Sequence, residues 1–87
     1  NAQKNNMEPI ILQLQPGARS KQIEPHQGEE FGYVLSGRIY LVREGYKKGA
    51  VVRRGYTFYI RGDVAHYLEN RGKQSAEVLW ISTPPEF

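Results

Sequence analysis

Cysteine is absent from this 87-residue sequence, and no run of apolar residues is long. Without cysteine the chain has no disulfide, no thiolate ligand for a metal ion and no thiol nucleophile. A helix that crosses a bilayer needs about 20 consecutive apolar residues, so we expect no membrane-spanning helix. No basic and then apolar leader is present, and a soluble, cytoplasmic protein is therefore the default expectation.

Charge of one sign is also scarce, because the formal net charge is only +3. The basic residues fall mostly at predicted turns and form no continuous stretch. A surface that binds nucleic acid normally clusters such residues on one element, with aromatic side chains placed to stack on bases. We therefore interpret the basic residues as parts of solvated loops, namely Arg38, Arg43, Lys47, Lys48, Arg53, Arg54, Arg61, Arg71 and Lys73.

The sequence does contain a series of short segments rich in β-branched and aromatic residues, separated by turn formers such as Pro16-Gly17 and Ser36-Gly37. No segment shows a sustained helical period. Strands of this length with a turn about every 8 to 12 residues are typical of an all-β sandwich or barrel. The predicted strands are Ile10–Gln15, Ser20–Glu24, Phe31–Leu35, Arg38–Arg43, Ala50–Arg53, Thr57–Ile60, Ala65–Asn70 and Glu77–Ser82.

The length of the chain allows one small domain with a modest core. Domains of this size are near the lower limit of what folds without partners, so a homodimer is expected. An edge strand is the natural mating surface, because a small open sheet gains core by pairing across a two-fold axis. The candidate is the N-terminal strand at Ile10–Gln15.

Both histidines of the chain lie in short motifs. Residues 24–37 read EPHQGEEFGYVLSG, and residues 55–70 read GYTFYIRGDVAHYLEN. Together they resemble the paired signature of the cupin superfamily, whose first motif contains two histidines, a glutamate and a glycine. The second motif of the family runs from a glycine to a histidine and an asparagine. The positions that keep the family's spacing are Glu30, Gly37, Gly55, His66 and Asn70.

The chain departs from the cupin pattern at three positions. Glu24 stands where the first histidine is usual, Arg61 where a proline is usual and Asp63 where a glycine is common. The resemblance covers roughly residues 10–83 and implies a double-stranded β-helix, also called a jelly-roll barrel. We expect residues 10–87 to form this barrel and residues 1–9 to be a linker-like segment.

The resemblance also implies a metal site. If the family's inward faces apply, His26, Glu30 and His66 converge inside the barrel. Two imidazoles and a carboxylate can hold manganese, iron, nickel or zinc with coordination positions left open. Glu24 precedes His26 by two residues on a predicted strand, so it projects to the same side and is a candidate fourth ligand. The residues expected to share the inward faces are Glu30, Gly32 and Val34 on one strand and His66, Leu68 and Asn70 on the other.

An alternative is a barrel that binds an organic ligand without metal, as in cupins of transcription regulators whose ligand set is partly eroded. The missing histidine at position 24 supports this alternative. Most aromatic residues are expected to pack in the core, but a tyrosine hydroxyl turned into the cavity would suit a small polar ligand. Asn70 fits better as a strand-end residue whose amide ties a turn. The candidates for ligand binding are Tyr33, Tyr40, Tyr67 and Asn70.

Residues 28–37 and the closing segment 78–87 closely resemble the C-terminal cupin domain of bacterial regulators that carry an N-terminal helix-turn-helix. Such domains sense a small-molecule effector and form homodimers. They meet DNA only through the helix-turn-helix, which is not in these residues. The polar segment 1–6 reads as a linker. The resemblance therefore implies the sensing and dimerisation domain of a transcription regulator.

Two other functions stay open. One is a small metal-dependent enzyme of dioxygenase or isomerase type, in which Glu24 or a tyrosine would move protons. The sequence has no serine nucleophile elbow and no phosphate-binding loop, and the neighbours Glu29 and Glu30 would point apart on a strand, so the sensing function is preferred. The other is a plain dimerisation module with no ligand.

Overall fold

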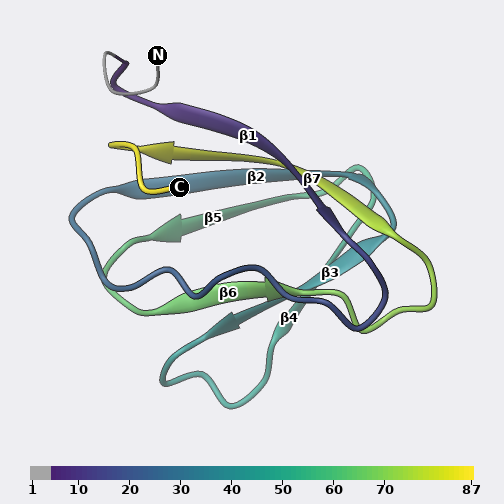
Figure 1. Ribbon diagram of the computed structural model, residues 1–87. Helices are drawn as coiled ribbons and strands as arrows, with labels where there is room; N and C mark the ends of the chain where they lie inside the picture. Colours follow the sequence, from purple (N-terminus) through teal and green to yellow (C-terminus); the bar gives the residue numbers. More distant parts are fainter. Residues whose placement is uncertain (1–4) are drawn as a thin grey trace.

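The computed structural model describes residues 5–87, and that part of the chain contains seven strands and no helix (Figure 1). The strands pair antiparallel in a four-stranded sheet, in the order β1-β7-β2-β5, and a three-stranded sheet, in the order β4-β3-β6. The expected jelly-roll barrel is thereby confirmed. Residues 5–87 include no helix that could span a membrane. The strands are β1 (Glu8–Leu14), β2 (Glu29–Ser36), β3 (Arg38–Arg43), β4 (Ala50–Arg53), β5 (Thr57–Arg61), β6 (His66–Glu69) and β7 (Ala76–Thr83).

One predicted strand, Ser20–Glu24, is wrong. This segment runs beside β6 but pairs with it only through isolated bridges at Arg19 and Ile23. The Ser20 hydroxyl, instead of a backbone carbonyl, accepts the Leu68 N–H at 3.0 Å. The Ser20 side chain thus accepts the Leu68 N–H, which a continuous strand would pair with a backbone carbonyl, and no ladder of backbone hydrogen bonds forms there.

The first strand begins earlier than expected. β1 starts at Glu8, inside the segment that we expect to be a linker, and pairs with β7 from that residue on. Pro9 is compatible with this position because β1 lies at the edge of its sheet, where one side of the strand needs no ladder hydrogen bond. Residues 1–4 of the expected linker lie outside the described residues.

The core lies between the two sheets and is centred on Trp80 of β7, which is almost completely buried. Phe58 packs edge-on against it, with the ring centroids 6.3 Å apart and the planes at 71°. Gly32 makes room for this pair, because a Cβ at that position would overlap the Phe58 ring. The expected alternation is confirmed on both strands that carry motif residues. The buried positions there are Glu30, Gly32, Val34, His66, Leu68 and Asn70.

The barrel has two distinct ends (Figure 1). On the right of the view lie the β2–β3 turn, the β4–β5 turn and the β6–β7 loop, and we call this the turn end, formed by residues 36–38, 54–56 and 70–75. On the left lie the start of β1, the segment entering β2, the β5–β6 turn and the C-terminal segment. We call this the site end, formed by residues 24–30, 61–66 and 83–87.

Candidate functional site with a buried carboxylate between two histidines

Glu30 is the centre of a polar cluster at the site end. It lies on β2 and faces inward because it alternates with the exposed residues Glu29 and Phe31. His66 is the first residue of β6, in the opposite sheet, and His26 lies in the segment that precedes β2. The structure therefore brings together three of the four predicted metal ligands.

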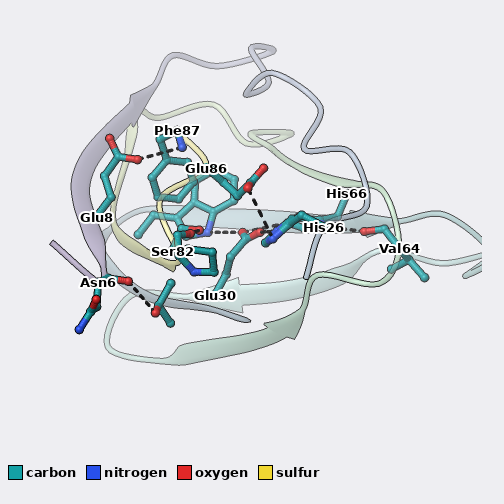
Figure 2. Close-up of polar contacts among 12 residues, drawn as sticks. Asn6, Glu8, His26, Glu30, Val64, His66, Ser82, Glu86 and Phe87 are labelled. Atoms are coloured by element: carbon teal, nitrogen blue, oxygen red, sulfur yellow. Dashed lines mark hydrogen bonds and ion pairs between the residues drawn. The ribbon is translucent and has the colours of Figure 1, made fainter. Parts of the chain in front are cut away.

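Both oxygens of the Glu30 carboxylate are engaged (Figure 2). Oε2 lies 2.8 Å from His26 Nε2, and Oε1 lies 2.8 Å from His66 Nε2. Trp80 Nε1 donates a further hydrogen bond to Oε1 at 2.8 Å. The side chains of Glu30 and His66 are fully buried, and that of His26 is 8% exposed. A charged group this deep requires such partners, because an unpaired buried charge is strongly unfavourable.

The contacts of His66 favour its doubly protonated form. Its Nδ1 faces the Val64 carbonyl oxygen at 3.0 Å, and its Nε2 faces the Glu30 carboxylate, so both ring nitrogens meet acceptors. Burial alone would lower the pKa of His66, but the hydrogen bonds to Glu30 and Val64 outweigh it and raise the pKa above the ordinary value of 6.5. Burial alone would raise the pKa of Glu30, but the hydrogen bonds from His66 and His26 bring it below the ordinary value of 4.5.

A glycine that the motif comparison does not single out positions His26. The His26 N–H donates to the Gly62 carbonyl at 2.6 Å, and a Cβ on Gly62 would lie 2.6 Å from His26 Cε1. Any side chain at Gly62 would therefore push the imidazole away from Glu30. In the sequence, only the position of Gly62 within the second motif could have indicated this role.

The C-terminal segment covers the cluster (Figure 2). Glu86 Oε2 lies 3.9 Å from His26 Nδ1, an atom that is buried and has no hydrogen-bond partner among the described residues. The Phe87 ring packs on Trp80, with the centroids 4.8 Å apart. The small hollow beside His26 is lined by residues 26–29 and 61–63 of the site end and does not include Glu30. Glu30 and His66 are thus closed to solvent, whereas His26 borders the small hollow. The end of the chain and Trp80 pack against the cluster, and the sequence analysis assigned neither of them to the site.

Glu24 is not part of the cluster. Its side chain is exposed, and its carboxylate accepts a hydrogen bond from Gln22 Nε2 at 2.7 Å. The expectation that it projects with His26 assumed a strand, and Ser20–Glu24 forms none. The predicted fourth ligand is therefore wrong in this structure.

The three tyrosines proposed to line the cavity face outward. Tyr33 lies on the exposed face of β2, Tyr40 packs under the Arg71 guanidinium and Tyr67 packs under that of Arg19. Each alternates with buried residues of its strand, so the expectation of tyrosine hydroxyls inside the barrel is wrong. A role of Tyr33, Tyr40 and Tyr67 in ligand binding stays a prediction.

The amide of Asn70 is fully committed to the protein. Its Nδ2 donates to the carbonyls of Leu14 at 2.9 Å and Gln74 at 2.8 Å, and its Oδ1 accepts the Gly72 N–H at 2.9 Å. Asn70 therefore ties the β6–β7 loop to the end of β1. These hydrogen bonds confirm the interpretation of Asn70 as a residue that ties a turn. Both hydrogens of its amide are used, so none is left to donate to a ligand inside the barrel.

The cluster fits a divalent metal in the type of its donor atoms. Two imidazole Nε2 atoms face one carboxylate, and His66 Nδ1 is oriented by a backbone carbonyl, as is usual for metal-ligating histidines. Within residues 5–87, however, no group of three His, Asp or Glu side chains is arranged to hold an ion as it stands. The three groups bond to one another instead, so a metal would have to replace their shared protons.

The sequence profile of the cupin domain family matches residues 10–82, and this chain belongs to that family. A comparison with curated proteins finds no match. Among solved structures, the cupin domain of an XRE family transcriptional regulator from Enterobacter cloacae is similar. It is 20% identical, with a TM-score of 0.80 over 95% of this chain and 86% of that one.

Two other solved structures share the fold with similar TM-scores. A predicted oxalate decarboxylase from Thermotoga maritima is 22% identical, with a TM-score of 0.80 over 94% of this chain and 70% of that one. An oxalate oxidase in complex with the substrate analogue glycolate is 23% identical, with a TM-score of 0.78 over 94% of this chain and 44% of that one. At these identities the likeness establishes the fold.

Proposed function

We propose that this cupin domain senses a small-molecule effector and self-associates within a cytoplasmic transcription regulator. DNA would be bound by a helix-turn-helix outside these residues. The observation that carries the proposal is the position of the C-terminal segment, which contacts both the buried cluster and the start of β1. The fold likeness to the cupin domain of an XRE family regulator supports it.

The contacts of the C-terminal segment give a route for the signal. Phe87 N donates to Glu8 Oε1 at 2.9 Å, and Thr83 Oγ1 donates to the Asn6 carbonyl at 2.7 Å (Figure 2). Glu86, in the same segment, lies against His26. A ligand that entered the cluster would displace Glu86 and so weaken the contact with Glu8. The effector would thus shift the equilibrium between two arrangements of the domain, and a module joined before β1 would be repositioned as a result.

The same proposal assigns His26, Glu30 and His66 as ligands of a divalent manganese, iron, nickel or zinc ion. Such an ion would supply a Lewis-acid contact for an oxygen atom of the effector. His66 is already oriented for this role by the Val64 carbonyl. Glu24 has no part in it, because its carboxylate is on the surface.

The enzyme alternative is supported by the fold likeness to the two oxalate enzymes. Against it stands the burial of the cluster. Glu30 and His66 have no exposed side-chain surface, and Trp80 occupies one of the carboxylate oxygens. An enzyme needs its substrate to reach the cluster in every turnover, whereas a sensor needs the cluster to open only when the effector binds.

Self-association is supported by the outer face of the four-stranded sheet. Ile11 is opposite Leu79, and Phe31 is opposite both Ile81 and Tyr59, so these side chains form one continuous apolar surface. Ile11 and Tyr59 are each more than half exposed. Monomeric proteins rarely leave such a surface uncovered, and a second copy of this small domain is the occupant that we propose.

The sensing function is tested by thermal unfolding of the EDTA-treated domain with each metal ion and with a set of small carboxylic acids. A ligand at about 100 times its Kd stabilises by ~2.7 kcal/mol, which raises the Tm of a domain of this size by roughly 10 to 20 °C. His66→Ala should abolish the metal shift, and Glu24→Ala should retain it. Elemental analysis of protein purified without chelator identifies the ion.

Other outcomes would select the alternatives. If no metal ion and no acid raises the Tm of the parent domain, the plain dimerisation module is correct. If the metal-loaded domain turns over oxalate, and His66→Ala loses that turnover, the enzyme alternative is correct and the sensing proposal is wrong.

A further inference from the structure

Five basic side chains meet at the turn end of the barrel, away from the Glu30 cluster. They belong to the start of β3, the end of β4 with its following turn, and the β6–β7 loop, which lie side by side in the fold (Figure 1). An open hollow of about 810 Å³ lies among them. We call it the basic hollow, and its principal side chains are Arg38, Arg53, Arg54, Tyr56, Arg71 and Lys73. The sequence analysis interprets these basic residues as parts of separate solvated loops, and the structure brings them together.

The positive charge of the basic hollow is hardly compensated. No acidic side chain lines it. Within residues 5–87, Arg71 is the one of the five basic residues that forms an ion pair, with Nε 2.9 Å from Glu69 Oε1. The other four cations form no ion pair within residues 5–87.

The strand register places two of these charges directly against each other. Arg38 of β3 is the cross-strand partner of Arg53 of β4, and both side chains are exposed. Like charges directly opposite on neighbouring strands are destabilising. Arg54 adds a third cation in the adjoining turn. An anion bound between these residues would remove the repulsion and would thereby stabilise the fold.

The shape and the side chains of the basic hollow specify the ligand further. Its volume falls in the range of about 300 to 1,000 Å³ that is usual for small-molecule sites. Guanidinium groups present paired N–H donors that match phosphate oxygens. Tyr56, which is 68% exposed, offers a ring at the rim of the hollow. A planar ring of a ligand could stack there, and its phosphates could reach the arginines.

We propose that the basic hollow binds a small molecule that carries at least two phosphate groups and a planar ring. The phosphates lie among Arg38, Arg53 and Arg54, and the ring packs on Tyr56. This site is at the opposite end of the barrel from His26, Glu30 and His66. It does not depend on the function proposed for that cluster.

The proposal is tested by isothermal titration calorimetry of the 87-residue chain at low salt, without divalent cations. ATP and tripolyphosphate should each bind at one site, and inorganic phosphate should bind at least about tenfold more weakly because it meets fewer arginines. The double variant R38Q/R53Q should lose at least about tenfold in affinity for ATP. Its Tm should be equal or higher, because the opposed charges are gone. Tyr56→Leu should weaken ATP but not tripolyphosphate.

A matched control separates a built site from general attraction. The double variant K47Q/K48Q removes the same charge from the exposed β3–β4 connection, outside the basic hollow, and should change the affinity less than about twofold. The proposal is overturned if ATP does not bind or if this control loses as much affinity as R38Q/R53Q. It is also overturned if duplex DNA displaces ATP and binds more tightly with each increase in length, because the surface would then be a contact for nucleic acid.

Discussion

Glu30 and His66 form an ion pair that is entirely buried between the two sheets, with Oε1 2.8 Å from Nε2. One residue comes from each sheet, so the pair connects the two layers of the barrel at the site end. Trp80 donates to the same oxygen, and His26 engages the other one. Removal of either charged partner would leave the other charge buried without compensation, so the fold is sensitive to the loss of this pair.

Glu30→Gln should destabilise the metal-free domain by about 3–5 kcal/mol, the usual cost of removing one partner of a buried ion pair. The measurement is urea unfolding near pH 6. Glu24→Gln is the matched control, because its carboxylate is exposed, and it should change the unfolding free energy by no more than about 0.5 kcal/mol. Equal effects of the two variants would contradict the buried pair.

The unfolding free energy of the metal-free domain should be highest between about pH 4.5 and pH 6.5. The pKa of Glu30 is lowered by folding, so its contribution is present above 4.5 and is lost as the pH falls through the folded value. The pKa of His66 is raised, so its contribution is complete below 6.5 and is lost as the pH rises through the folded value. Urea unfolding at a series of pH values in EDTA measures this, and Glu30→Gln should flatten both limbs. A stability that climbs steadily above pH 7 would contradict the assignment.

Phe87→Ala should open the cover of the cluster. Phe87 is partly buried, so we expect a loss of about 1–2 kcal/mol, less than the ~3–5 kcal/mol for a fully buried phenylalanine. Trp80 is the single tryptophan of the chain, so its fluorescence reports on this region alone. Its emission should shift to the red and become accessible to acrylamide. Tyr46→Ala, at an exposed position between β3 and β4, should leave the emission unchanged; a shift of equal size there would refute the covering role.

Phe31→Glu should weaken self-association, because it places a charge at the centre of the apolar face of the four-stranded sheet. We expect the dimer Kd to rise at least about tenfold, as for the burial of one unpaired charge in an interface. Val51→Glu is the matched control on the other sheet, since Val51 is 42% exposed and Phe31 is 40% exposed. Light scattering over a range of concentrations measures both. A parent domain that stays monomeric throughout, or a control with the same effect, would argue against this face.

The sequence analysis placed some site residues correctly and others wrongly, and the reason differs from residue to residue. The inward positions of Glu30 and His66 were predictable because each lies on a strand, where alternation decides the face. The position of Glu24 was not, because Ser20 uses its side chain to bond Leu68 and the segment forms no strand. The expectation for the tyrosines failed although alternation argues against it, because a strand that turns Glu30 and Val34 inward turns Tyr33 outward. That expectation followed the chemistry of the hydroxyl group and not the face of the strand.

The sequence by itself determined an all-β domain, because strand alternation and turn chemistry are local properties of the chain. The jelly-roll barrel and the convergence of His26, Glu30 and His66 were implied by the resemblance of the two motifs to the cupin family. Only the tertiary structure decided that Phe87 and Glu86 cover the cluster and that basic residues of three separate turns share one hollow. Those contacts join segments that are distant in sequence. Their positions follow from how the two sheets pack and where each connection crosses the barrel, which no local pattern encodes.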